Sequence, residues 1–208
     1  MPGNGPVMED SVMPVWEAGQ PGIPPLAIDL PRDRDQVSAA IRTAHDAGVV
    51  VVPRGGGMYY TKGYLPSRPD SVVIDSRRLN RIVELDTDSL YVTVESGCTW
   101  AALNEALEGT GLRTGYWGPL SGINATIGGA LSQNSAFFGS ALHGTVAESV
   151  LGVTVVLADG RTVTTGSGGR VGTKPFTRSG GPQRGGGAAP RDSGAVLQPG
   201  RRQLAGRP

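Results

Sequence analysis

The sequence predicts a fold that mixes helices and strands, and three parts of the chain carry that prediction. Residues 25–53 have the pattern of a strand, a helix and a second strand. Residues 71–76 and 90–96 are short runs rich in Val, Ile and Tyr, which favour strands. Residues 149–165 hold two further strand-like runs around the turn sequence ADGR, which is typical of a hairpin.

Length and composition limit the class of protein. At 208 residues the chain suffices for one or two domains, and 38% of its residues are hydrophobic. It has one cysteine, Cys98, which excludes an intrachain disulfide. No stretch is apolar for long enough to span a bilayer, and the first residues lack the basic and apolar regions of a secretory signal. We therefore expect a soluble, cytoplasmic protein without a membrane partner.

The strand–helix–strand unit can be followed residue by residue. The first strand, residues 25–31, ends at a proline, and the second covers residues 49–53. Between them we expect a helix over residues 32–48, with apolar residues spaced i, i+3, i+4 and i+7 at Val37, Ala40, Ile41 and Ala44. The second strand leads directly into residues 54–57, and the carboxyl end of a strand is where open α/β sheets bind ligands.

The rest of the chain divides into a globular part and a tail. We expect a helix over residues 99–111 with Thr99 as N-cap, and a short helix or helical turn within residues 126–139. Residues 170–208 carry eight basic side chains and one acidic one. We expect three regions, a flexible lead-in at 1–24, a folded domain at 25–179 and a disordered basic tail rich in Gly, Pro and Arg at 180–208. The tail has no aromatic residues to stack bases, so we expect no specific nucleic-acid partner, although a nucleic-acid-binding module stays a third hypothesis.

The glycine triplet after the second strand is the first candidate binding loop. Backbone N–H groups of Gly55, Gly56 and Gly57 can converge on an anion, and Arg54 adds a fixed positive charge. Taken alone, the triplet is more often a tight turn than a binding site. It is neither a Walker loop nor a dinucleotide fingerprint, because no Gly-Lys-Ser/Thr follows and residues 58–66 do not begin a helix.

A second glycine-rich loop lies within residues 118–161. Thr126, Gly128 and Gly129 can present backbone N–H groups, while Ser132 and Asn134 supply a hydroxyl and an amide. Gly139 and Gly144 would let a flat ligand lie against the backbone. Two separate loops of this kind suit a long ligand with a diphosphate in its middle.

The order of four motifs extends this interpretation. PRGGG, VTVESG, ATIGGALSQNS and SVLGVTVVLADG, within about Pro25 to Ser179, resemble the FAD-binding domain of the vanillyl-alcohol oxidase / para-cresol methylhydroxylase (PCMH) type. The resemblance implies an α+β domain of two subdomains that hold FAD between them, in a flavin-dependent oxidoreductase that oxidises a hydroxylated small molecule by hydride transfer to FAD. It also implies cofactor contacts from the first loop at Arg54, Gly55, Gly56, Gly57, Met58 and Tyr59, from the second loop at Pro119, Ala125, Thr126, Gly128, Gly129, Ser132 and Asn134, and from the following segment at Gly139, Gly144 and Val150.

The sequence departs from this family at three points. Met58 stands where members with FAD bound covalently through this loop have a histidine, so we expect non-covalent FAD. The resemblance stops at Ser179, so we expect a domain that is incomplete at its C-terminus. We expect the substrate domain to be absent from this chain, and the sequence identifies no catalytic residues. The alternative is a non-catalytic truncated fragment with weak or no FAD binding.

A few other side chains have an ordinary explanation beside a functional one. His45 and His143 are isolated, so we expect no metal site. Cys98 begins a helix, which can lower a thiol pKa, but a packing role is favoured. Tyr59, Tyr60 and Tyr64 crowd the first loop, and packing on the cofactor and packing on the domain stay equally open.

Overall fold

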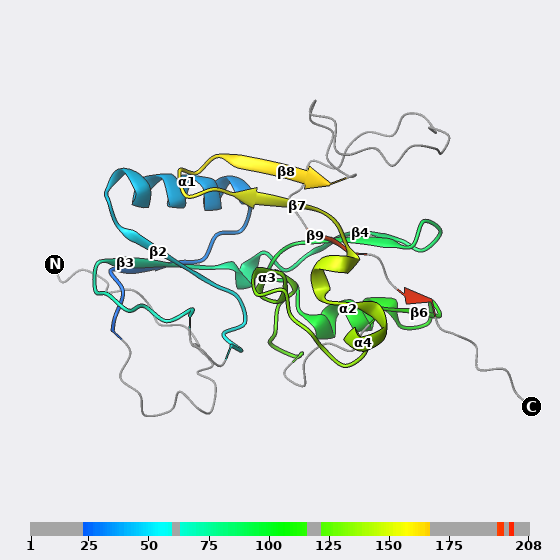
Figure 1. Cartoon of the computed structure of the whole chain (residues 1–208). Coiled ribbons are helices and arrows are strands. Elements are labelled where there is room, and N and C mark those ends of the chain that lie inside the picture. The colour runs from blue at the N-terminus through cyan, green and yellow to red at the C-terminus, as the bar shows by residue number, and fades with distance from the viewer. Residues whose placement is uncertain (1–22, 60–62, 116–121, 167–194, 198–199, 202–208) are drawn as a thin grey trace, which may run out of the picture.

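The computed structural model describes residues 23–59, 63–115, 122–166, 195–197 and 200–201. In these residues two larger sheets, each with its own helices, are joined by the segment of residues 76–81 (Figure 1), and residues 112–113 and 200–201 form a third sheet of two short strands. The predicted α+β class of two subdomains is confirmed. Pro119, most of the predicted lead-in and residues 167–194 lie outside the described residues.

The first subdomain is built on a parallel sheet. Its strands run in the order β1 (Ala27–Asp29), β3 (Ser71–Asp75) and β2 (Val50–Arg54), and α1 (Arg34–Asp46) connects β1 to β2. Arg54 is therefore the last residue of β2, and it lies opposite Asp75, the last residue of β3. The sheet thus delivers the glycine triplet at the carboxyl ends of its strands, as the sequence predicts.

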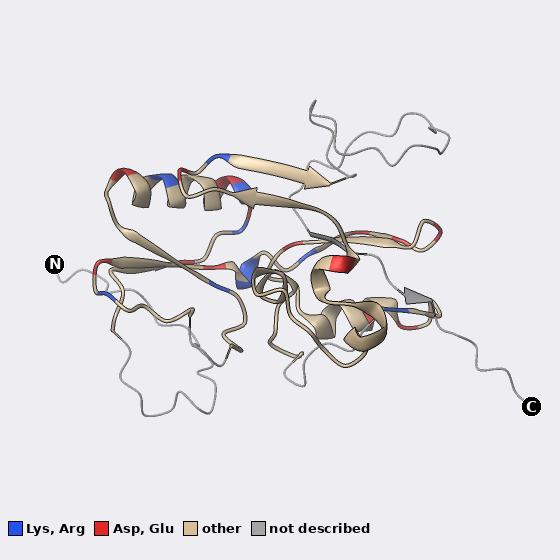
Figure 2. Cartoon of the chain, in the orientation of Figure 1, with Lys and Arg blue, Asp and Glu red and all other residues tan. Residues whose placement is uncertain are grey.

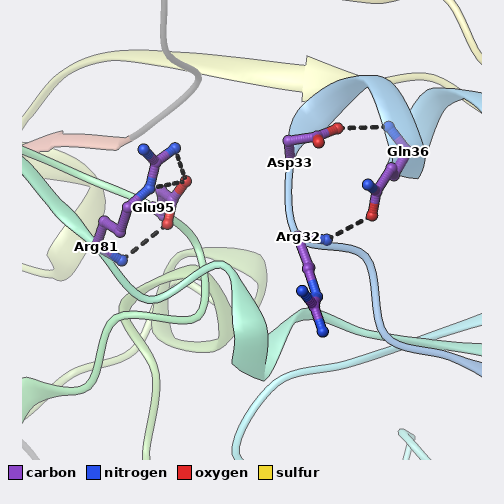
Figure 3. A network of polar contacts seen from close by, with 5 residues as sticks. All are labelled: Arg32, Asp33, Gln36, Arg81 and Glu95. Carbon is purple, nitrogen blue, oxygen red and sulfur yellow. Dashed lines mark hydrogen bonds and ion pairs between the residues drawn. The ribbon is translucent and has the colours of Figure 1, made fainter.

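Helix α1 begins two residues later than predicted because of its N-cap. The Asp33 carboxylate accepts a hydrogen bond from the backbone N–H of Gln36 at 2.8 Å. The Gln36 side-chain oxygen in turn accepts from the backbone N–H of Arg32 at 2.9 Å (Figure 3). The first bond satisfies a donor that the first helical turn leaves without a partner, and the second satisfies the N–H of the residue before the N-cap.

The second subdomain is built on an antiparallel sheet. Its order is β4 (Ile82–Asp86), β5 (Tyr91–Val94), β9 (Ala195–Leu197), β7 (Val150–Val156) and β8 (Thr162–Gly166). The predicted hairpin is confirmed as β7 and β8. The turn of this hairpin lies against α1, where the Ser38 hydroxyl donates to the carbonyl of Gly160 (Figure 1).

Strands β9 and β10 (Gly200–Arg201) lie within the tail for which the sequence predicts no regular structure. The structure differs from that prediction at these residues. β9 pairs with both β5 and β7, whose facing edges would otherwise leave backbone groups without partners. A strand of three residues is too short to show the alternation by which strands are predicted.

The helices of the second subdomain cover the core. α2 (Trp100–Leu107) and α3 (Ile127–Ser132) pack on β5, and Trp100 meets Phe137 edge-on with ring centroids 5.6 Å apart. The predicted N-cap is confirmed, since the Thr99 hydroxyl accepts from the N–H of Ala102. Shorter elements complete this subdomain: β6 (Leu112–Arg113), α4 (Ser140–His143) and the 3-10 helix η3 (Val146–Ser149). In the described part of the chain no helix is both long enough and apolar enough to cross a membrane.

Two buried carboxylates hold the segment that joins the subdomains. Asp75, 1% exposed, accepts from the backbone N–H and the guanidinium of Arg77 in the 3-10 helix η2 (Ser76–Arg78). Glu95, 3% exposed, accepts from the backbone N–H of Arg81 at 2.8 Å and from its guanidinium (Figure 3). The segment is thereby fastened to β3 at one end and to the end of β5 at the other.

We predict that Glu95→Gln lowers the free energy of unfolding by about 1–3 kcal/mol, because a neutral amide replaces a buried carboxylate that accepts charge-assisted bonds. Urea denaturation followed by circular dichroism measures the change. Glu105→Gln is the matched control, since Glu105 is exposed on α2. Equal unfolding midpoints for the two variants would contradict the structural role of Glu95.

Candidate functional site

A cavity of about 980 Å³ opens between the two subdomains. One wall comes from α1, β2 and the loop that follows β2, and the other comes from α3 and β7. The volume is in the range of sites for cofactors and other small molecules. Of the residues predicted to contact a cofactor, those that line this cavity are Arg54, Gly55, Gly56, Gly57, Met58, Tyr59, Ala125, Thr126, Gly128, Gly129, Ser132 and Val150.

Asn134, Gly139 and Gly144 do not line the cavity; they shape the chain between α3 and β7. The Asn134 side chain, on a residue with φ of 47°, accepts from the N–H of Ala147 at 3.2 Å. Gly139 has φ of 103° and precedes α4, and a Cβ at Gly144 would lie 2.2 Å from the Glu148 carboxylate. Small residues in turns serve folding and ligand contact alike, so the sequence could not separate these roles.

The cavity also has an apolar arm that the sequence does not predict. Val37 and Ile41 of α1 face it from one side, and Val153 and Val155 of β7 from the other. The apolar spacing of Val37 and Ile41 predicts the helix but not what this face of it meets, and Ala44 is the buried residue of that helix. No charged residue occurs in β7 (Figure 2). An arm of this kind suits a flat, largely apolar ring.

The first glycine loop has the chemistry of an anion site. Among the described residues, none accepts a hydrogen bond from the backbone N–H groups of Gly55, Gly56, Gly57 and Met58. Gly57 has φ of 68°, which turns the loop in a way that favours glycine. Successive N–H groups in such a turn carry a partial positive charge that attracts anions. The Arg54 guanidinium adjoins the same turn.

The second glycine loop differs from the prediction at Gly128 and Gly129, because their N–H groups are used inside the protein. The N–H of Gly128 donates to the carbonyl of Ser96 at 2.8 Å, and the N–H of Gly129 donates to the Thr126 hydroxyl at 3.2 Å. The Ser132 hydroxyl donates to the carbonyl of Gly128 at 2.8 Å. At Gly128 and Gly129 this loop therefore lines the cavity with residues whose N–H groups already have acceptors.

The two glycine loops pack directly on each other. A Cβ at Gly55 would lie 2.4 Å from the Thr126 hydroxyl oxygen, and one at Gly56 would lie 1.7 Å from the carbonyl oxygen of Asn124. Real side chains do not approach other atoms so closely. Gly55 and Gly56 are therefore required by the contact between the loops, whatever ligand the cavity holds.

The remaining reactive side chains stay away from the cavity. His45 is exposed, and His143 packs beside Gly115. The Cys98 thiol is fully buried, and burial, helped by the charge of Glu95, raises its pKa to about 11. The packing role of Cys98 is thus favoured by the structure. Within the described residues no group of three His, Cys, Asp or Glu side chains could hold a metal ion.

Comparison with known proteins gives a consistent result. A family profile described as "FAD binding domain" matches residues 25–166. The mitochondrial D-lactate dehydrogenase (cytochrome) of Kluyveromyces lactis is 34% identical over 143 residues, which cover 68% of this chain and 24% of the relative. Glycolate oxidase subunit GlcD of Bacillus subtilis is 32% identical over 144 residues, covering 68% of this chain and 30% of the relative. The chain thus spans about a quarter to a third of the length of these relatives.

Solved structures agree on the fold. The structure of p-cresol methylhydroxylase with bound substrate matches with a TM-score of 0.68 at 17% identity, over 88% of this chain and 37% of that one. A glucooligosaccharide oxidase from Acremonium strictum with 6-S-cysteinyl, 8α-N1-histidyl FAD matches with a TM-score of 0.61 at 26% identity, over 69% of this chain and 29% of that one.

We predict that Gly56→Ala destabilises the protein in the absence of any ligand, because the new methyl group meets the backbone of Asn124 and forces the loops apart. Gly129→Ala is the control in the same cavity wall, since its Cβ would come no closer than 3.1 Å to the Thr126 hydroxyl. Overpacking of this kind costs about 1–3 kcal/mol, which thermal unfolding resolves. Equal melting temperatures would contradict the packing role of Gly56.

We predict that the Cys98 thiol of the folded protein reacts about 100-fold more slowly with iodoacetamide at pH 8 than the unfolded chain does, because its pKa is raised to about 11. Labelling followed by mass spectrometry with and without urea measures both rates. The same shift makes stability depend on pH. The thiol ionises at a lower pH in the unfolded chain than in the folded protein. The contribution of Cys98 to the free energy of unfolding is therefore fully present below about pH 9 and is lost as the pH rises to about 11. Equal labelling rates would contradict the burial of the thiol.

Proposed function

Because this chain belongs to the FAD-binding domain family of the p-cresol methylhydroxylase type, we propose that its cavity binds FAD with the diphosphate on the first glycine loop. One observation carries the proposal. Four consecutive backbone N–H groups, at residues 55–58, line the cavity without an acceptor among the described residues. A diphosphate supplies the acceptor oxygens that such a turn requires.

Each part of the cavity has a role in this proposal. The N–H groups of residues 55–58 hold the phosphate oxygens, and the Arg54 guanidinium offsets their negative charge. The arm between α1 and β7, with Val37 and Val153, takes a flat ring system at one end of the cofactor. The second glycine loop positions the first by packing against Gly55 and Gly56.

We propose that the chain is the FAD-binding part of a flavin-dependent oxidoreductase that acts on a hydroxylated small molecule. Its relatives named for D-lactate and glycolate support this class of substrate. A bound flavin supplies the chemistry of accepting a hydride, while this chain binds and orients it and excludes water from it.

The cavity wall supports cofactor binding rather than complete turnover. Removing a hydride from a hydroxylated carbon also requires a base for the hydroxyl proton, usually a histidine or a carboxylate. Among the described residues that line the cavity there is no Asp, Glu or His. We therefore propose that the base is supplied from outside this wall.

We further propose that FAD is bound without a covalent bond. Met58 lines the cavity in the position expected for a linking histidine, and its thioether has no such chemistry. The described lining also contains no cysteine or histidine, and Cys98 is buried elsewhere. In this respect the chain departs from the glucooligosaccharide oxidase with doubly linked FAD.

The cellular location is a separate proposal. We propose the cytoplasm. The D-lactate dehydrogenases of Kluyveromyces lactis and Saccharomyces cerevisiae are named mitochondrial. Cell fractionation decides between the two compartments.

We predict that the purified chain takes up added FAD, quenches or shifts its fluorescence, and carries it through gel filtration. Acid precipitation should release all of the flavin into the supernatant, because no covalent bond holds it. Arg54→Met should weaken binding about 10-fold or more, the value of a charge-assisted hydrogen bond.

Arg78→Met is the matched control, because Arg78 is exposed in η2 and does not line the cavity. A folded chain that fails to retain FAD would contradict the proposed function and favour the alternative of a fragment that does not bind it. Flavin that precipitates with the protein would contradict only the non-covalent mode.

A further inference from the structure

Tyr64 lines the same cavity, and its hydroxyl does not explain its position. The residue is 7% exposed, and its buried hydroxyl oxygen has no hydrogen-bond partner among the described residues. A buried hydroxyl without a partner costs roughly 1–3 kcal/mol, so a phenylalanine would fit this place at least as well in the free protein. The contact that the structure shows for Tyr64 is at its ring.

The ring face of Tyr64 meets the arginine that begins the first glycine loop. The Arg54 guanidinium carbon lies 5.5 Å from the centroid of the Tyr64 ring. A guanidinium within about 6 Å of an aromatic centroid is attracted by the negative face of the ring. This attraction strengthens when the pair is removed from water, as it is for a ring this deeply buried.

Arg54 is held at its other end by the backbone. Its carbonyl accepts a hydrogen bond from the Ser76 hydroxyl at 3.1 Å, and its strand position is fixed by pairing with Asp75. A Cβ at Gly57 would lie 3.1 Å from the Arg54 Nη2 nitrogen, so the guanidinium is close to the turn of the loop. The aromatic ring thus helps to set where the charge lies relative to the N–H groups of residues 55–58.

A second cation lines the cavity, but its place differs. Arg34 belongs to the first turn of α1, at the end of the apolar arm, and its guanidinium pairs with Asp35 at 3.3 Å. Among the described residues that line the cavity, Arg54 is the cation beside the first glycine loop. Its orientation therefore decides how the loop meets a negatively charged group.

We propose that Tyr64 is a positioning residue for the cofactor diphosphate, because its ring face holds the Arg54 guanidinium beside the N–H groups of the first glycine loop. The role rests on the proposed binding of FAD. It belongs to the ring alone, and the hydroxyl takes no part in it. Tyr64 is absent from the contacts that the family resemblance implies.

The test is a set of variants at position 64, made in the unaltered chain and in Arg54→Met, with FAD affinity measured by fluorescence titration. Tyr64→Phe keeps the ring and should bind FAD as the unaltered chain does, with an equal or higher melting temperature. Tyr64→Leu should bind about 2- to 30-fold more weakly, the range of a cation–π contact. In the Arg54→Met chain, Tyr64→Leu should cause no further loss.

Tyr64→trifluorophenylalanine covers the case in which Tyr64→Leu does not fold, because fluorination keeps the shape of the ring and removes most of the negative potential of its face. It should bind FAD more weakly than Tyr64→Phe does. Equal affinity for these two variants, or a loss in Tyr64→Phe as large as that in Tyr64→Leu, overturns the proposal. An unaltered chain that does not bind FAD overturns the proposed function first, and the role of Tyr64 with it.

Discussion

The backbone contact between residues 55–56 and residues 124–126 is the constraint on which the rest of this structure depends. It is a contact between two loops from different subdomains, and it is close enough that a methyl group on Gly55 or Gly56 would overlap the opposite chain. Thr126 links this contact to the helical layer, because its hydroxyl also caps α3. Gly128 continues the link to the end of β5 through Ser96. The two cavity walls therefore owe their spacing to backbone packing.

This constraint separates two roles that glycine-rich loops often combine. The first loop keeps its N–H groups free of acceptors among the described residues, and the second uses those of Gly128 and Gly129 internally. One loop can therefore bind an anion while the other supports it. Loss of ligand in a variant of Gly56 would not by itself identify a ligand contact, because the same change separates the loops. Variants of Arg54 and Tyr64 leave that backbone contact in place and are better probes of binding.

The sequence determined the parts of the fold that local pattern controls. The strand–helix–strand unit, the β7–β8 hairpin, the Thr99 cap and the position of both glycine loops follow from periodicity and turn chemistry. The rest depends on contacts between distant residues. An apolar stripe identifies one face of α1 but not whether that face meets protein or a cavity, so the sequence does not predict that Val37 and Ile41 line the cavity. The short strand β9 is defined by the edges of β5 and β7 rather than by its own residues.

The position of Val37 and Ile41 also bears on how a cofactor relates to folding. In the described structure these side chains are half-buried and face Val153 and Val155 across an open arm, so the two subdomains do not complete a hydrophobic core between them. Apolar surface left in contact with water forgoes about 25 cal/mol for each Å² that burial would remove. On the proposed function, the flat ring of FAD supplies the missing apolar partner, while its diphosphate supplies the missing acceptors at residues 55–58. The cofactor is then a structural component of the interface between the subdomains, and cofactor affinity and domain stability share the same contacts.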